Sequence, residues 1–295
     1  MKIGIDLGGS HVAVGVVTEE GKLLVKQEKN ISFVNQEKEK IQEQIRDHIV
    51  SLINATLKEI HVPIFLIEKI GIGIPGIVED NKIKKCNKFK IIDWDLAQEL
   101  EQHYGIGVRI QNDALCAAMA EKEYGALKDI KKAVFLCFGT GIGGVTIIEK
   151  QIIPSEYGHM IIQRDGKECN CGRKGCFETY SSMKVFKDEM IKLLKLDENT
   201  TSEGLLEILR KEKENSEVNA YIDQYIQTAL IGISNIVNII NPKRICIGGS
   251  FVYFEDILYK RLLEKALTME CQFEKPKIVL AKLGNTAGII GATLI

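Results

Sequence analysis

The densest group of metal-binding side chains lies in the middle of the chain. Four nitrogen and sulfur ligands fall within eighteen residues: His159, Cys169, Cys171 and Cys176. They form a complete Cys₃His set for tetrahedral zinc, and closed sites of this kind are structural rather than catalytic. Gly172 and Gly175 allow the tight turns that the cysteine spacing demands. The stretch therefore predicts a structural zinc site that orients two flanking carboxylates, Glu156 and Glu178.

The three cysteines could instead form disulfides or a redox pair. Disulfides need an oxidising compartment, whereas the first residues run straight into a strand pattern without the features of a signal peptide. A redox pair usually has two intervening residues, and Cys169 and Cys171 have one. We therefore expect a cytoplasmic chain with reduced cysteines. The scattered cysteines are expected to be buried as small apolar residues: Cys86, Cys116, Cys137, Cys246 and Cys271.

Glycine-rich turns follow strands at corresponding places in the two halves of the chain. They are residues 6–10 (DLGGS), residues 139–144 (GTGIGG) and the pair Gly248–Gly249. The second turn matches the dinucleotide fingerprint, but the β-branched residues 145–148 follow it where that fingerprint needs a helix. A hairpin is expected instead. An ordinary hairpin explains one turn but not its recurrence, and the backbone N–H groups of two such turns would suit a polyphosphate.

Two aspartates could take part in phosphoryl chemistry. Asp6 ends the first strand beside a glycine turn, where a carboxylate next to phosphate needs an intervening cation such as Mg²⁺. Its alternative role is a turn cap. Asp113 begins a helix behind Asn112, a position that interaction with the helix dipole explains without any catalytic role. The alternative for Asp113 is a general base that accepts a hydroxyl proton.

These residues are carried by alternating strands and helices. In the first half we expect strands at 2–7, 12–17, 22–26, 69–74 and 108–111, and helices at 36–60, 95–104 and 112–124. In the second half we expect strands at 133–138, 145–148, 152–153, 243–247 and 278–281, and helices at 182–196, 202–209, 218–240, 255–267 and 286–294. Each half begins with three strands, so two similar α/β domains with a ligand cleft between them are predicted.

Composition narrows the class of protein. The chain has 295 residues, of which 45% are apolar, as expected of a globular protein. Its net charge of −1 does not favour nucleic acid as a partner. No apolar run approaches the roughly eighteen residues that cross a bilayer. Small molecules are the expected partners.

The motifs together resemble the ROK family (repressors, open reading frames and kinases) of the actin-like ATPase superfamily. Besides the glycine turns, the matching stretches are GIPG at 73–76, QNDALCAAMAE at 111–121, EYGHM at 156–160, CNCGRKGCFETYSS at 169–182 and INPKRICIGGS at 240–250. The resemblance implies two actin-like (ribonuclease H-like) α/β domains. One would span residues 1–114 joined by the C-terminal helix 285–295. The other would span 115–284 and carry the zinc knot, the name we use for His159, Cys169, Cys171 and Cys176.

The resemblance also implies roles for individual residues. Residues of the two phosphate motifs would bind ATP: Asp6, Gly8, Gly9, Ser10, Gly139, Thr140, Gly141, Gly143 and Gly144. Gly248 and Gly249 would lie beside adenosine, Mg²⁺ would accompany ATP, and Asp113 would be the catalytic base. The sugar-binding residues would be Asn87, Asn112, Asp113, Glu156, His159 and Glu178. His159 and the three cysteines would hold Zn²⁺, and a homodimer is expected by resemblance alone.

The implied activity is ATP-dependent phosphorylation of a hexose 6-hydroxyl. Glu156 and the short interval between His159 and Cys169 resemble the glucokinase branch of the family more than its N-acetylhexosamine branches, which implies glucose as the leading substrate. Residues 145–155 are shorter than is usual in the family, and Ser155 stands in place of the usual glycine. N-acetylglucosamine, N-acetylmannosamine or a β-glucoside is therefore an alternative substrate. The remote alternative is a sugar-responsive repressor. Family repressors carry a helix-turn-helix before the first strand, which here begins at residue 2.

Overall fold

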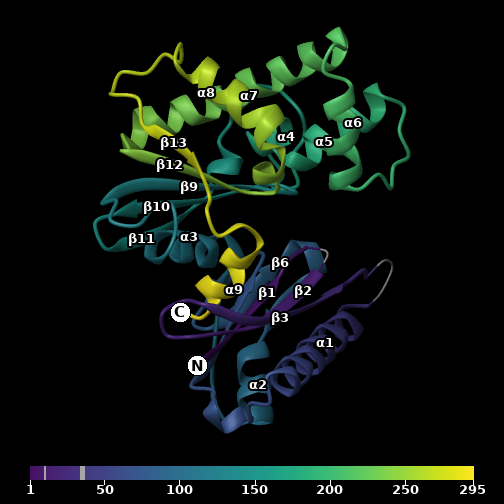
Figure 1. The fold of residues 1–295 in the computed structure, drawn as a ribbon, viewed down its shortest axis with the longest axis vertical. Coiled ribbons are helices and arrows are strands. Elements are labelled where there is room, and N and C mark those ends of the chain that lie inside the picture. The colour runs from purple at the N-terminus through teal and green to yellow at the C-terminus, as the bar shows by residue number, and fades with distance from the viewer. Residues whose placement is uncertain (10, 34–36) are drawn as a thin grey trace. The chain divides into compact units, whose positions relative to one another are not determined.

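The structure, a computed structural model, describes residues 1–9, 11–33 and 37–295. The chain forms two compact units, Met1–Lys128 with Asn285–Ile295 and Asp129–Gly284. The first unit therefore combines both ends of the chain, as the purple and yellow ribbons of Figure 1 show. Ser10, predicted to bind phosphate, and residue 36, the predicted start of the first helix, lie outside the described residues.

The first unit is built on a five-stranded sheet in the order β3-β2-β1-β4-β8. Its strands are β1 (Lys2–Leu7), β2 (His11–Val17), β3 (Leu23–Asn30), β4 (Lys69–Ile74) and β8 (Gly107–Asn112). The first three are antiparallel neighbours, and β4 and β8 run parallel to β1. The carboxyl ends of β1, β4 and β8 therefore meet at one edge of the sheet, where ligands bind in open α/β sheets.

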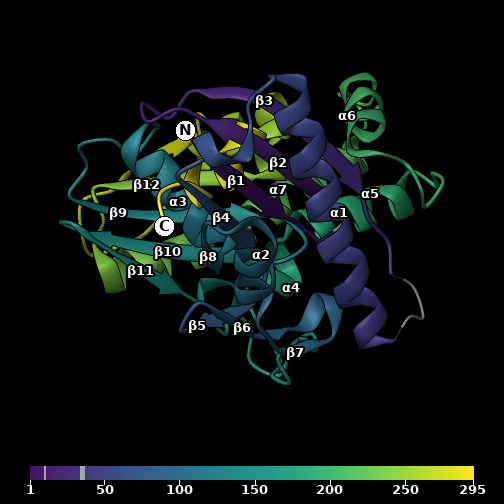
Figure 2. The same cartoon turned by 90° about the horizontal axis from the view of Figure 1, so that it is seen from below.

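Alternating residues of β1 face opposite sides of this sheet. Ile3 and Ile5 are fully buried in a core shared with α1 (Lys38–Glu59), which Figure 2 shows beside β2 and β3. Gly4 faces the other side, where a Cβ would overlap the backbone carbonyl of Ile289 in α9 (Ala287–Ala292). The missing side chain thus lets this short helix lie directly on the strand.

Helix α9 also packs against α3 (Asp113–Glu123). A Cβ on Gly291 of α9 would overlap the carbonyl of Cys116 in α3, and one on Gly71 of β4 would overlap the carbonyl of Ala292. The two helices therefore cover the same face of the sheet as one tightly packed layer.

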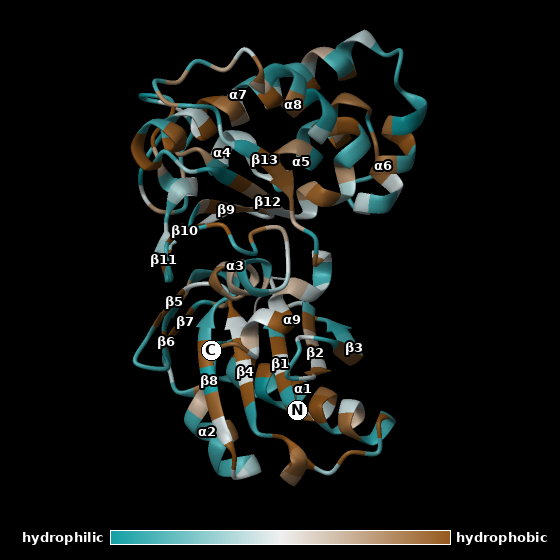
Figure 3. Cartoon of the chain, turned by 60° about the vertical axis from the view of Figure 1, so that its left-hand side comes forward, coloured by the Kyte–Doolittle hydropathy of each residue, from teal (hydrophilic) through white to brown (hydrophobic). Residues whose placement is uncertain are grey.

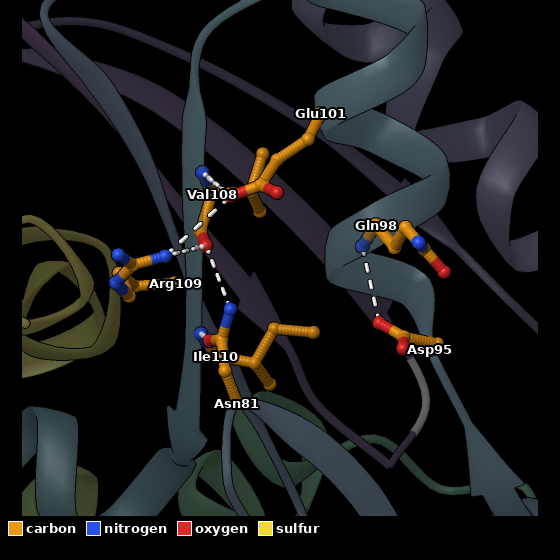
Figure 4. A network of polar contacts seen from close by, with 7 residues as sticks. All are labelled: Asn81, Asp95, Gln98, Glu101, Val108, Arg109 and Ile110. Atoms are coloured by element: carbon orange, nitrogen blue, oxygen red, sulfur yellow. Dashed lines mark hydrogen bonds and ion pairs between the residues drawn. The ribbon is translucent and has the colours of Figure 1, made fainter.

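A second, three-stranded sheet in this unit was not predicted. It consists of β5 (Ile77–Glu79), β6 (Lys82–Cys86) and β7 (Ile91–Trp94), and a 3₁₀ turn at Asn87–Phe89 joins the last two strands. Asn81, in the turn before β6, joins this sheet to β8 (Figure 4). Its amide donates to the Val108 carbonyl at 3.0 Å and accepts from the Ile110 N–H at 2.7 Å. One side chain thus satisfies backbone groups at the free edge of β8.

Helix α2 (Leu96–Tyr104) protects the same edge of β8. The Glu101 carboxylate accepts from the Val108 N–H at 2.9 Å, and Arg109 donates to the Val108 carbonyl at 3.0 Å (Figure 4). The predicted ends of this helix are confirmed. Asp95 caps it by accepting from the Gln98 N–H, and Gly105 closes it at φ 69°.

The second unit repeats the plan of the first. Its sheet has the order β11-β10-β9-β12-β13 and consists of β9 (Lys132–Phe138), β10 (Ile142–Ile148), β11 (Gln151–Ser155), β12 (Arg244–Gly249) and β13 (Lys277–Leu280). Strands β9 to β11 are antiparallel, and β12 and β13 run parallel to β9. The repeat predicted from the strand pattern is confirmed at the level of topology.

Helices of the second unit share one core with β9 and β12. They are α5 (Met183–Leu193), α6 (Ser202–Lys211), α7 (Ser216–Ile240) and α8 (Lys260–Ala266), and the short helix α4 (Glu178–Ser181) follows Phe177, which also lies in this core. Figure 3 shows the apolar stripes of the strands that these helices cover. Two details differ from the prediction. Helix α6 runs to Lys211 rather than to residue 209, with Thr201 as its N-cap, and a π-helical turn at Glu255–Tyr259 precedes α8. Within the described residues, every helix is too short or too polar to cross a membrane.

Candidate functional site

Asp6 and Asp113 are brought together at the carboxyl edge of the first sheet. Asp6 pairs in register with Gly73 of β4, and Gly73 pairs with Gln111 of β8, two residues before Asp113. A Cβ on Gly73 would lie 3.4 Å from the Asp113 Cα. Glycine at this position thus lets the first turn of α3, which begins at Asp113, lie close to β4. We refer to Asp6 and Asp113 as the aspartate pair.

Asp113 is electrostatically unusual. Enclosure by protein raises the pKa of its carboxyl from 3.8 to about 6, and the negative charge of Asp6 adds to the effect. The side chain keeps some solvent-accessible surface, while its Oδ1 accepts from the Ala114 N–H at 2.8 Å. A carboxyl group with this pKa can take up a proton near neutral pH, as a general base must.

His11 is a member of this site that the sequence did not reveal. Its Nε2 lies 3.9 Å from Asp6 Oδ2, and the neighbouring Asp6 carboxylate raises the pKa of the ring. The ring occupies the space that a Cβ on Gly8 would need. Only the hairpin between β1 and β2 places His11 there, and no spacing rule in the sequence marks it.

Two predicted sugar-binding asparagines also belong to the first unit. Asn112 caps α3 by accepting from the Leu115 N–H at 3.1 Å, and its amide donates to the Gly76 carbonyl at 3.1 Å. One donor and one lone pair remain for a ligand. Asn87 is exposed and follows Cys86, whose pKa is raised to about 11 by burial and, in part, by the charge of Asp113. Asn87 therefore lies near the aspartate pair.

The glycine motifs of the second unit meet at one edge of its sheet. Gly139 donates to the Gly141 carbonyl at 2.9 Å in a turn between β9 and β10, so the expected hairpin is confirmed. Gly249 of β12 pairs with Phe138, the residue before that turn. Its φ of 73° and the overlap of any Cβ with the Phe138 carbonyl require glycine. The predicted phosphate and adenosine segments are thus neighbours.

The four predicted zinc ligands are also brought together. One ligand atom from each of His159, Cys169, Cys171 and Cys176 lies within 4.8 Å of the others. Cys169 Sγ is 3.6 Å from His159 Nδ1, and Cys171 Sγ is 3.6 Å from Cys176 Sγ. Zinc–sulfur bonds of about 2.3 Å place tetrahedral ligands at about this separation. The residues therefore fit a zinc ion, which His159 would contact through Nδ1.

The electrostatics of the cysteines suit a metal. The Arg173 N–H, aided by its guanidinium group, lowers the pKa of Cys171 to about 6. Burial raises the pKa of Cys169 and of Cys176. Zinc binds cysteines as thiolates. The lowered pKa of Cys171 therefore favours metal binding, whereas zinc would have to displace a proton from Cys169 and from Cys176.

The two predicted sugar-binding carboxylates flank this knot. Glu156 Oε2 lies 3.8 Å from His159 Nε2, on the nitrogen that faces away from the cysteines. Glu178 Oε1 lies 3.6 Å from His159 Nδ1 and 3.2 Å from Cys169 Sγ. Its Oε2 accepts from the Ile142 N–H at 3.3 Å. Glu178 thus connects the knot to the second glycine turn.

Comparison with known proteins identifies the family. The sequence pattern that defines the ROK family matches residues 2–295. The chain belongs to the ROK family. A glucokinase from Thermotoga maritima is 28% identical over 99% of this chain and 96% of its own. A xylose repressor from Caldicellulosiruptor bescii is also 28% identical, over 98% of this chain and 76% of its own.

The fold is that of solved ROK proteins. A ROK family glucokinase from Streptomyces griseus, solved with glucose and AMPPNP, has a TM-score of 0.81 at 24% identity and covers 99% of this chain and 97% of its own. The predicted α/β fold of the actin-like class is confirmed. ROK relatives include both kinases and repressors, so the family alone does not specify what this member does.

Proposed function

We propose that this chain is an ATP-dependent hexose kinase that phosphorylates the 6-hydroxyl, with glucose as the first substrate to test. The aspartate pair carries the proposal. Holding Asp113 in surroundings that raise its pKa to about 6 costs folding stability. Sugar binding alone does not need such a group, whereas transfer of a hydroxyl proton does.

In the proposed reaction, Asp113 accepts the proton of the attacking hydroxyl as the sugar oxygen bonds to the γ-phosphorus of ATP and the bond to ADP breaks. The neutral amides Asn87 and Asn112 would orient sugar hydroxyls on the first unit. Glu156, His159 and Glu178 are proposed to do so on the second unit. The glycine turns at Gly8–Gly9 and 139–144 are proposed to bind the phosphates through backbone N–H groups other than those of Gly8 and Gly139, which donate within the turns. Gly248–Gly249 would allow close approach of adenosine.

Asp6 is the residue proposed to hold Mg²⁺. Its carboxylate lies at the end of β1, and magnesium in kinases binds one or two carboxylates together with phosphate oxygens. When bound, the ion would neutralise charge on the phosphates. The zinc ion is proposed to hold His159 so that Nε2 is directed toward the sugar and Glu156.

The hairpin of β10 and β11 bears on the choice of sugar. The Thr146 hydroxyl lies 2.8 Å from the Ser155 hydroxyl and 2.5 Å from that of Tyr157. Thr146 thus holds the residues on both sides of Glu156, one of which is the serine that replaces the usual glycine. We propose that this short, rigid hairpin shapes the sugar pocket, so N-acetylglucosamine, N-acetylmannosamine and β-glucosides belong in the substrate test.

A coupled assay of ADP release over a sugar panel tests the proposal. Glucose-dependent ADP release that Asp113→Asn abolishes would support it, and a stronger response to another sugar would reassign the substrate. If sugars bind without ADP release, the kinase proposal is wrong and the repressor-like alternative gains support. Cytoplasmic location and a homodimer remain proposals that rest on the family.

A further inference from the structure

One cation near the aspartate pair has no role in the function proposed above. Lys88 occupies the middle of the 3₁₀ turn Asn87–Phe89, between β6 and β7. Cys86 and Phe89 on either side are 0% and 3% exposed, whereas Lys88 is exposed. Because these buried neighbours anchor the turn, the lysine is presented outward from a fixed backbone.

The Lys88 side chain lies over the first glycine turn. A Cβ built on Gly9 would be 3.2 Å from Lys88 Cε and 3.8 Å from Nζ. The lysine stem thus uses the space that glycine leaves free, and the ammonium group lies beside the backbone of the predicted phosphate motif. Both residues belong to the first unit, although 79 positions (88 − 9) separate them in the sequence.

The charges around Lys88 indicate which kind of ligand its ammonium group would bind. Among the described residues, no ion pair involves Lys88. Asp6 pairs with His11 instead, and the negative charge of Asp6 adds to the effect of burial in raising the pKa of Asp113. A phosphoryl group entering here adds negative charge, and a lysine ammonium is a compact charge suited to phosphate.

We propose that Lys88 binds the phosphoryl group that is transferred, at the turn formed by Gly8 and Gly9. This inference rests on the proposed kinase function. Lys88 forms and breaks no covalent bond. It donates hydrogen bonds to phosphoryl oxygens while the sugar oxygen bonds to phosphorus, ADP departs and Asp113 takes the hydroxyl proton. It follows Asn87 directly, so one turn would serve both the sugar and the phosphoryl group.

Lys88→Met tests the inference, with Lys90→Met as the matched control, because Lys90 is an exposed lysine at the end of the same turn. We expect kcat to fall roughly 10²-fold in Lys88→Met, the usual effect of losing one donor to transition-state charge. The KM for sugar should change less than about twofold, since a γ-phosphate contact contributes nothing to sugar binding alone. Lys88→Arg should restore part of kcat, and Lys90→Met should resemble the natural chain.

Nucleotide binding provides a second measurement that needs no sugar. Calorimetric titration should show that Lys88→Met weakens binding of AMPPNP, which carries a γ-phosphate, more than it weakens binding of ADP. If Lys88→Met matches Lys90→Met in both kcat and nucleotide preference, the inference is wrong while the kinase proposal stands. If the natural chain turns over no sugar, the kinase proposal fails, and an unchanged AMPPNP preference would then overturn the role of Lys88 as well.

Discussion

Replacing Asp113 by Asn should stabilise the fold while it abolishes phosphorylation. The pKa of this carboxyl is raised from 3.8 to about 6 in the folded chain. The folded state therefore binds the proton more tightly than the unfolded state. The energetic cost of ionisation is absent below about pH 4, grows as the pH rises through about 6, and is constant above it. Asn has no such cost and can keep the hydrogen bond from Ala114.

The size of this effect follows from the two pKa values. The cost to the natural chain is about 1.5 kcal/mol at pH 5 and about 3 kcal/mol at pH 8. At about 2 °C per kcal/mol for a chain of this length, Asp113→Asn should melt about 3 °C higher at pH 5 and about 6 °C higher at pH 8. Loss of a general base should lower kcat by about 10²-fold to 10⁴-fold.

The assay is thermal unfolding of both proteins across this pH range, together with ADP release at pH 8. Asp95→Asn is a matched control, because Asp95 caps α2 and Asn caps helices equally well. That variant should change neither activity nor the pH dependence of melting. The reasoning would be refuted if Asp113→Asn melted at or below the natural temperature at pH 8. Near-normal turnover in the variant would independently remove Asp113 from the role of base.

Three further predictions follow from the site. First, kcat/KM should fall about tenfold for each pH unit below about 6, because Asp113 must be ionised to accept a proton; a flat profile from pH 5 to 8 would contradict this. Second, elemental analysis should find about one zinc per chain, and chelation or Cys171→Ser should lower the melting temperature. A zinc-free chain that is insensitive to chelators would exclude the knot as a metal site. Third, Gly249→Ala should destabilise the fold by about 1–3 kcal/mol, because φ is 73° and the methyl group would overlap the Phe138 carbonyl. Unfolding by urea measures this, with Gly107→Ala as a control where a Cβ meets nothing within 4 Å.

The order of the elements could be predicted because it is encoded locally. Apolar alternation marks the strands, and caps such as Asp95 and Gly105 mark helix ends. The four zinc ligands lie within eighteen residues of sequence, so the grouping of their side chains could be predicted from their spacing alone. The sheet of β5 to β7 was missed because its strands have only three to five residues and mix polar with apolar side chains.

The contacts of the first unit's site depend on turn geometry and on the pairing of distant segments, and could not be predicted. His11 reaches Asp6 through a hairpin turn, and Lys88 reaches Gly9 from a turn far along the chain. The raised pKa of Asp113 depends on its enclosure by the fold and on Asp6, which is distant in sequence. Residue types alone favoured a helix-dipole role for Asp113 over the alternative of a general base, and only the resemblance favoured the base. The roles assigned to individual site residues stay predictions.

The packing of α9 on β1 has a consequence for how the chain acquires its native state. The helix that covers Gly4 is made of residues 287–292, and its Gly288 abuts the carboxylate of Asp6. These residues follow the whole second unit in the sequence and are therefore translated after it. One face of the first unit's sheet therefore stays without α9 while the whole second unit, Asp129–Gly284, is synthesised and can fold. The surroundings of Asp6 are completed only when residues 287–292 pack on β1, so a nascent chain cannot assemble them before the second unit is made.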